Sequence, residues 1–188
     1  MADIDLTDLL KKKMKSYPRT RGRYNSSELY YITKGYTTPE EWFNSPEKDM
    51  KQIVDMWNGI GAHNQIQDLL GKQFCEKKVE MVYKDIVLVA KGDFFPPALP
   101  DEVWEFKSSD KLMKIAKPGH IYQAKIYCSM FEKKTGIVYQ PIQNKDGIYL
   151  KDLGSVERDD AWLEEQLEKL YEFHLKVEVL WENKIKNK

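Results

Sequence analysis

Cysteine is scarce in this chain of 188 residues, which contains two, Cys75 and Cys128. They do not form a CxxC pair, so a zinc site or an iron–sulfur cluster held by four thiolates is excluded within one chain. We therefore expect no iron–sulfur cluster, and we expect both thiols to be small core residues in a reducing, intracellular setting.

Long apolar stretches are also missing. No apolar run approaches the roughly 18 residues that a membrane-spanning helix requires. The first residues, MADIDLTDLLKKK, have acids where a signal peptide carries its basic and apolar regions. We therefore expect a soluble, cytoplasmic protein with no membrane partner.

Neither sign of charge is in excess, because 30 basic and 30 acidic side chains give a formal net charge of zero. The total therefore indicates no polyanionic partner. The distribution is uneven, since residues 11–23, KKKMKSYPRTRGR, are rich in Lys and Arg and contain no acid. We expect a basic N-terminal arm over residues 1–25 and a single domain over residues 26–188.

The arm and the residues after it combine cations with aromatic rings, a mixture that suits single-stranded nucleic acid. The candidate contacts are Arg19, Arg21, Arg23, Tyr30 and Tyr31. The alternative is a solvated tail, which is the commoner outcome for a run of like charges.

The hydrophobic pattern predicts helices, then a sheet, a helix, further strands and a final helix. Thr38, Pro39 and Glu41 form a helix-start signature, and a helical pattern follows over residues 50–70. An antiparallel meander is expected at 79–83, 86–95 and 103–109, a helix at 120–134, strands at 136–142 and 146–153, and a long helix at 159–184.

Two glycines interrupt the predicted helix of residues 50–70. Apolar side chains before Gly59 and after Gly61 would lie on different faces of a continuous helix, which predicts a break at this point.

The final helix carries aromatic residues around its circumference, among them Trp162, Phe173 and Trp181. It either closes the core of its own chain or packs on another subunit. The second alternative would make the protein a homo-oligomer.

Two acids and a lysine are expected to converge on the hairpin of the second and third predicted strands. Its turn, PPALPDE, is centred on Leu99, and symmetry about this residue places Asp93 opposite Glu105. Cross-strand neighbours lie about 4.5 to 5.5 Å apart at Cβ. Strand alternation puts Lys107 on the same face as Glu105, with Phe106 pointing away.

Two carboxylates side by side repel each other unless a proton or a cation lies between them. Carboxylate and main-chain oxygens suit Mg²⁺ or Mn²⁺, and either ion carries water that can act as a nucleophile. Lys107 would orient this water or neutralise charge on a phosphate. The alternative is a surface strand whose acids pair with lysines, which contributes about 0.2 to 1 kcal/mol per pair.

Four short motifs follow one another along the chain. They are Gly59 to His63 as GxxxH, Gly92-Asp93, Glu105-Phe106-Lys107 as ExK, and His120, Gln123 and Tyr127 as HxxQxxxY. In this order they resemble the motifs of the PD-(D/E)XK nuclease superfamily, specifically its RecB-like branch, which includes the CRISPR-adaptation exonucleases.

The resemblance implies an α/β fold with a restriction-endonuclease-like core, in which helices flank a mixed central sheet and a long C-terminal helix follows. It also implies a site for Mg²⁺ or Mn²⁺, whose ligands are His63, Asp93, Glu105 and the main-chain carbonyl of Phe106.

The resemblance further implies a catalytic role for Lys107. Gln123 and Tyr127 lie at i and i+4 on one helical face, from which they would reach the scissile phosphate. The implied activity is a metal-dependent deoxyribonuclease that prefers DNA ends or single strands.

The chain departs from the family pattern at two places. Gly92 and Asp93 are adjacent, whereas the family leaves one or two residues between them. Ile32 stands where the iron–sulfur members place a cysteine, which indicates a member without a cluster. Two alternatives stay open: a nuclease-like fold that only binds nucleic acid or protein, and a structure-specific endonuclease that acts as a dimer.

Overall fold

The computed structural model describes residues 7, 10, 19–44, 49–109 and 111–186, so most of the expected basic arm lies outside the described residues. The helices are α2 (Ser26–Thr33), α3 (Pro39–Asn44), α4 (Met50–Leu70), α5 (Pro118–Met130) and α6 (Asp160–Lys186). The strands are β1 (Arg23–Asn25), β2 (Cys75–Tyr83), β3 (Ile86–Phe94), β4 (Glu102–Phe106), β5 (Thr135–Asn144) and β6 (Gly147–Glu157). None of the helices in these ranges combines the length and the apolar character needed to cross a bilayer.

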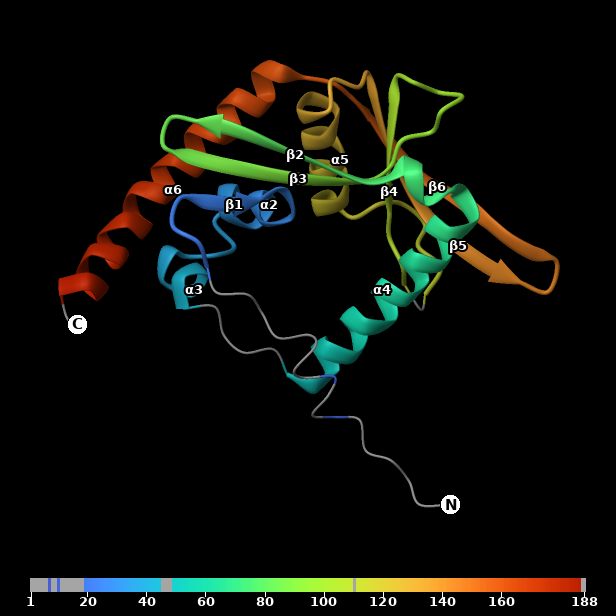
Figure 1. Ribbon diagram of the computed structural model, residues 1–188, viewed down its shortest axis with the longest axis horizontal. Coiled ribbons are helices and arrows are strands. Elements are labelled where there is room, and N and C mark those ends of the chain that lie inside the picture. The colour runs from blue at the N-terminus through green and yellow to red at the C-terminus, as the bar shows by residue number, and fades with distance from the viewer. Residues whose placement is uncertain (1–6, 8–9, 11–18, 45–48, 110, 187–188) are drawn as a thin grey trace.

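The strands form one mixed sheet (Figure 1). β3 pairs antiparallel with β2 along one edge. Further along the sheet, β4 pairs parallel with β5, and β5 pairs antiparallel with β6. The α/β fold class and the mixed central sheet predicted from the sequence are confirmed, as is the antiparallel meander of β2, β3 and β4.

Two strands share the second edge of β3 and run towards each other along it. β1 is parallel to β3, and its register ends at the pair Asn25 and Val89. β4 is antiparallel to β3 and pairs with it at Phe94 and Trp104. Residues 90–93 of β3 therefore lie between the two ladders. The C-terminal ends of β1 and β4 face each other across this gap, and after each of them the chain turns away from the sheet. The sheet opens at this point.

The main core lies between the sheet and α2, α3, α5 and α6 (Figure 1). On α6, Leu163, Leu170 and Val177 repeat at helical spacing and are buried, so that one apolar face of the helix packs on the core. Trp162 and Trp181 pack against the same core. The C-terminal helix therefore closes the core of its own chain, while its packing on another subunit stays a prediction.

Gly136 allows α5 to approach β5 closely. A Cβ at this position would lie 2.7 Å from the carbonyl oxygen of Ala124 and 2.8 Å from Sγ of Cys128. Because relieving these clashes requires a shift of the helix, we expect Gly136→Ala to destabilise the fold by about 3 kcal/mol and to lower Tm by about 6 to 12 °C. Thermal unfolding measures the change.

The matched control for this substitution is Gly61→Ala in α4. Among the described residues nothing lies within 4 Å of the added Cβ, so we expect a gain of up to about 1 kcal/mol from helix propensity. A similar fall in Tm for both variants would contradict the packing argument.

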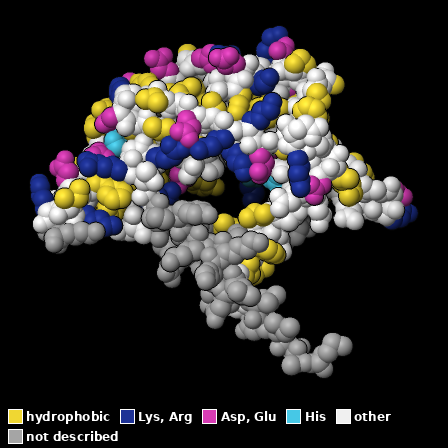
Figure 2. Space-filling view, in the orientation of Figure 1, with side chains coloured by type: hydrophobic (Ala, Val, Ile, Leu, Met, Phe, Trp, Pro, Cys, Tyr) yellow, Lys and Arg dark blue, Asp and Glu magenta, His cyan; other side chains and the backbone are white. Residues whose placement is uncertain are grey.

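α4 is one continuous helix of 21 residues, so the predicted break at Gly59–Gly61 is wrong. Glycine costs about 1 kcal/mol in a helix but keeps its N–H group, so the hydrogen-bond ladder continues. Its apolar side chains are buried at separate places: Ile66, near the C-terminal end, packs in the cluster of Phe106, and Ile53, near the N-terminal end, is also buried. The helix projects from the sheet (Figure 1), and a hollow lies between it and the rest of the molecule (Figure 2).

Residues 23–25, which the sequence assigned to the arm, form β1 and belong to the sheet. Tyr24 is fully buried, and its hydroxyl lies 3.0 Å from Nδ1 of His174 on α6. A strand of three residues is too short for a recognisable alternation. The predicted domain limits stay a prediction, and the sheet begins before residue 26.

Candidate active site

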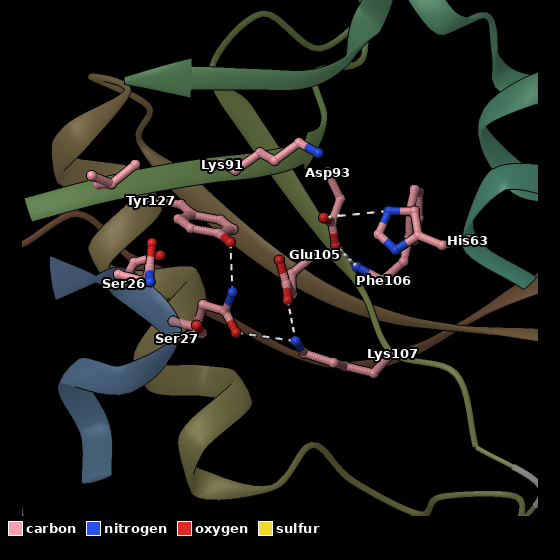
Figure 3. A pocket seen from close by; sticks show the side chains of 12 residues that line it. Ser26, Ser27, His63, Lys91, Asp93, Glu105, Phe106, Lys107 and Tyr127 are labelled. Atoms are coloured by element: carbon pink, nitrogen blue, oxygen red, sulfur yellow. Dashed lines mark hydrogen bonds and ion pairs between the residues drawn. The ribbon is translucent and has the colours of Figure 1, made fainter. Parts of the chain in front are cut away.

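A cavity of about 310 Å³ opens where β1 and β4 end beside β3 (Figure 3). Its walls come from the start of α2, from β3 and β4, and from α4 and α5. The structure brings together on these walls every residue predicted for the metal and catalytic site: His63, Asp93, Glu105, Phe106, Lys107, Gln123 and Tyr127.

The two acids lie on neighbouring strands of the hairpin. Phe94 pairs with Trp104 across β3 and β4, which is the register that symmetry about Leu99 predicts. The next pair along the strands is Asp93 and Glu105, so their side chains share one face.

Asp93 is fixed by the main chain of the opposite strand. Its Oδ2 accepts a hydrogen bond of 2.7 Å from the N–H of Phe106. The preceding Gly92 has no room for a side chain, because a Cβ there would lie 2.6 Å from Cζ of Phe95. The aspartate therefore reaches the cavity although it follows its glycine directly.

Burial makes both carboxyl groups harder to ionise. Glu105 is 2% exposed, and its Oε2 has no hydrogen-bond partner among the described residues. Burial, together with the neighbouring Asp93, raises the pKa of Glu105 to about 8. Burial also raises the pKa of Asp93 to about 6. At neutral pH the pair therefore retains a proton whose place a cation can take.

His63 approaches the acids from α4. Its Nε2 lies 3.3 Å from Oδ1 of Asp93, and its ring meets the ring of Phe106 edge to face with 5.9 Å between centroids. Burial lowers the pKa of His63. The imidazole is therefore neutral at pH 7 and keeps a lone pair for a metal ion.

A chain of polar contacts runs from Lys107 to α5 (Figure 3). Nζ of Lys107 forms an ion pair with Glu105 and donates a hydrogen bond of 3.0 Å to Oε1 of Gln123. Nε2 of Gln123 donates one of 2.6 Å to the hydroxyl of Tyr127. Burial and the nearby Glu105 and Asp93 raise the pKa of Tyr127 well above its usual value, so the phenol stays protonated.

The donor set of carboxylates, an imidazole and a main-chain carbonyl suits Mg²⁺ or Mn²⁺. Within the part of the chain that the structure describes, no three side chains of His, Cys, Asp or Glu are gathered closely enough to hold an ion as they stand. Lys107 and the N–H of Phe106 each bind one of the two acids instead. The buried, unpartnered Oε2 of Glu105 is the atom that a cation would satisfy.

The predicted nucleic-acid contacts lie outside the cavity wall. The three arginines pair with carboxylates, Arg19 with Glu28, Arg21 with Glu178 and Arg23 with Glu80. Tyr31 is 52% exposed, whereas Tyr30 packs partly buried against the core. None of these three arginines and two tyrosines is among the described residues that line the cavity, and their contact with nucleic acid stays a prediction.

Four polar residues of the cavity wall were not predicted from the sequence: Asn25, Ser26, Ser27 and Lys91. Asn25 and Glu28 form a capping box at the start of α2. This N-x-x-E pattern could have predicted the start of the helix, but Asn25 had been assigned to the arm. Lys91 lies two residues before Asp93 on the same strand, so alternation places both on one face. Its Nζ pairs with Glu76 at 2.8 Å.

The fold has relatives among solved structures, although no protein-family model and no curated protein matches the sequence. The crystal structure of SSO0001 is similar with a TM-score of 0.62 at 18% identity, over 88% of this chain and 84% of that chain. LHK-Exo, an alkaline exonuclease from Laribacter hongkongensis, is similar with a TM-score of 0.57 at 13% identity, over 97% of this chain and all of that chain. The complex of LHK-Exo with dAMP has a TM-score of 0.56 at 13% identity, over 89% of this chain and 96% of that chain.

At such low identities the likeness shows the fold alone. It extends over 88% of this chain for SSO0001 and over 97% for LHK-Exo. It does not separate the RecB-like branch from other nuclease families. The chain therefore has the α/β fold of known nucleases, as its sequence predicts.

Proposed function

We propose that this chain is a metal-dependent deoxyribonuclease of the RecB-like branch of the PD-(D/E)XK superfamily. The observation that carries the proposal is the pair of buried acids, Asp93 and Glu105, beside Lys107 in one cavity. Burying two carboxyl groups together destabilises a fold, and such groups cluster at functional sites. Hydrolysis of a phosphodiester needs a cation held by acids, with a further positive charge close by.

Mg²⁺ or Mn²⁺ fits the cavity by its donor chemistry, with His63, Asp93, Glu105 and the Phe106 carbonyl as ligands. The bound ion supplies two things: it polarises the phosphate and it lowers the pKa of the attacking water. Neutralising the two carboxylates also removes the cost of their burial.

The side chains of the protein position the substrate and balance its charge. Lys107, held by Gln123, presents its ammonium group to the cavity, where it orients the attacking water and neutralises charge on the phosphate. Gln123 in turn is held by Tyr127. The protonated phenol of Tyr127 can donate a hydrogen bond to an oxygen of the neighbouring phosphate.

We infer that the substrate is a DNA end or a single strand. LHK-Exo is described as an alkaline exonuclease, and one of its structures contains dAMP. The GxxxH motif supports the same substrate by resemblance to the exonuclease members. The alternatives are a nuclease-like fold that only binds nucleic acid or protein, and a structure-specific endonuclease that acts as a dimer.

Incubation of the purified protein with linear single- and double-stranded DNA tests the activity. We expect the DNA to be degraded in Mn²⁺ and to stay intact in excess chelator. Lys107→Ala should lower the rate at least about 100-fold, because it removes the positive charge beside the phosphate. Equal degradation by the wild type and by Lys107→Ala, or none by either, would contradict the enzyme and favour a binding module.

Covalently closed circular DNA separates an exonuclease from an endonuclease. We expect circles to stay intact under conditions that degrade linear strands of the same sequence. Loss of circles at a similar rate would favour the structure-specific endonuclease.

A further inference from the structure

The segment between β4 and α5, residues 107–117, is strongly basic, and we call it the lysine loop. Its sequence, KSSDKLMKIAK, has four lysines and one acid. Lys111, Lys114 and Lys117 are exposed, and no carboxylate of the described residues lies within ion-pair distance of them. The loop also exposes two aliphatic side chains, Leu112 at 65% and Ile115 at 75%.

A buried glutamine holds the lysine loop in place. Gln140 of β5 is 2% exposed, and its Nε2 donates a hydrogen bond of 2.9 Å to the carbonyl of Lys111. Its Oε1 accepts one of 2.9 Å from the N–H of Met113. Lys151 of β6 donates a hydrogen bond of 2.6 Å to the carbonyl of Met113. The main chain at Lys111 and Met113 is therefore fixed, and the exposed lysines of this part of the loop project from a preorganised surface.

The lysine loop runs from the cavity to the start of α5. Lys107 lines the cavity, and Lys117 directly precedes α5. Burial and the charges of Lys107 and Lys117 lower the pKa of His120, in the first turn of α5, to about 4. Ser108 faces α4, since a Cβ at Gly59 would lie 3.2 Å from its Oγ.

A groove of about 310 Å³ continues the cavity between α4 and the lysine loop. It shares His63, Phe106 and Lys107 with the cavity, and Met56 and Ile60 form its wall on α4. Lys and Arg side chains border the hollow at this side of the molecule (Figure 2). The wall on α4 is thus largely apolar, Glu76 of β2 adds one carboxylate, and the opposite wall contains Lys107 and Ser108, the first two residues of the lysine loop.

We propose that the groove between α4 and the lysine loop is the path by which a single strand of DNA reaches the cavity. The exposed lysines bind the phosphates of the strand, and the exposed aliphatic side chains contact its bases. A single strand fits this surface better than a duplex, because only unpaired bases present their faces to apolar side chains. This inference rests on the proposed function and names the form of its substrate.

Binding measured without cleavage tests the path. Fluorescence anisotropy of a labelled oligo(dT) strand in excess chelator gives the affinity between about 50 and 200 mM salt. Each phosphate contact with a single strand adds about 0.7 to the slope of log K against log salt. The triple variant Lys111→Gln, Lys114→Gln, Lys117→Gln should therefore lower this slope by about 2 and weaken binding at least about 10-fold at low salt.

The matched control removes three exposed lysines from the β5–β6 turn and from α6: Lys145→Gln, Lys169→Gln and Lys176→Gln. We expect its slope to equal that of the wild type. If the slope of log K against log salt is unchanged in the lysine-loop variant, or falls equally in the control variant, the proposed path is wrong.

Cleavage and binding can fail separately. If linear DNA is degraded but the loop variant keeps the wild-type slope, the path is overturned and the nuclease stands. If the slope falls as expected but no DNA is degraded, the path is supported and the proposed activity fails.

The aliphatic pair tests the preference for single strands. Leu112→Ser with Ile115→Ser removes apolar contact and no charge, so we expect binding of oligo(dT) to weaken about fivefold. Binding of a blunt duplex should not change. An equal loss on both substrates, or no loss on either, would overturn the contact with unpaired bases.

Discussion

Glu105→Gln is expected to abolish Mn²⁺-dependent cleavage, lowering kcat/KM by at least about 1,000-fold. Glutamine has the same shape but lacks the charge that holds a cation and pairs with Lys107. The loss should appear in kcat and leave DNA binding in chelator unchanged, because Glu105 is 2% exposed. Single-turnover cleavage of an end-labelled strand measures the effect.

The same strand offers a matched control, Glu102→Gln. This carboxylate accepts a hydrogen bond of 2.7 Å from Nε1 of Trp104 and is not among the described residues that line the cavity. We expect its activity to stay within about twofold of the wild type. Comparable activities of Glu102→Gln and Glu105→Gln would contradict the role of Glu105.

Glu105→Gln is also expected to stabilise the metal-free protein at pH 8. The pKa of Glu105, about 8 in the fold, is about 4.3 in an unfolded chain. The folded protein therefore binds this proton more tightly, and its free energy of unfolding falls as the pH rises from about 4.5 to about 8. Glutamine does not ionise, so we expect Glu105→Gln to lose less stability than the wild type as the pH rises to 8, and to have the higher Tm of the two at that pH.

Thermal unfolding in chelator at pH 5 and pH 8 measures this difference. The wild type and Glu102→Gln should both lose stability between the two pH values, whereas Glu105→Gln should lose less. Mn²⁺ should raise the Tm of the wild type at pH 8 and have little effect on Glu105→Gln, because the ion binds only the folded protein. Parallel pH profiles for all three proteins would show that Glu105 ionises normally in the fold.

The hairpin that carries the acids could be predicted to its register because its determinants are local. The β-branched run of β3 and the proline-rich turn around Leu99 set the pairing of Phe94 with Trp104. The start of α3 is equally local, since the N–H of Thr38 donates to Glu41 and the N–H of Glu41 donates to Thr38. Features of this kind depend on residues close together in the chain.

The features that the sequence did not predict depend on distant contacts. β1 becomes a strand only because it pairs in parallel with β3, far along the chain. Arg21 pairs with Glu178, 157 residues away, and no local pattern indicates such a partner. α4 likewise continues through Gly59 and Gly61, because the hydrophobic period reports which side chains are buried and not the main-chain hydrogen bonds that continue a helix.

The candidate site combines both kinds of information. Motif order predicted which side chains converge, because helix and strand spacing place Gln123 with Tyr127 and Glu105 with Lys107. The depth of burial of Glu105 and the hydrogen bond that fixes Asp93 are properties of the folded packing. These two properties turn a hairpin that its sequence describes as surface-like into one wall of a buried, acidic cavity.

A crystal of the protein soaked in Mn²⁺ and measured at the manganese absorption edge tests the central claim most directly. We predict one anomalous peak within about 2.5 Å of carboxylate oxygens of Asp93 and Glu105, next to the carbonyl of Phe106 and the imidazole of His63. A fully occupied manganese peak elsewhere with none between these acids, or no peak at saturating Mn²⁺, would contradict the assignment of this cavity as the metal centre.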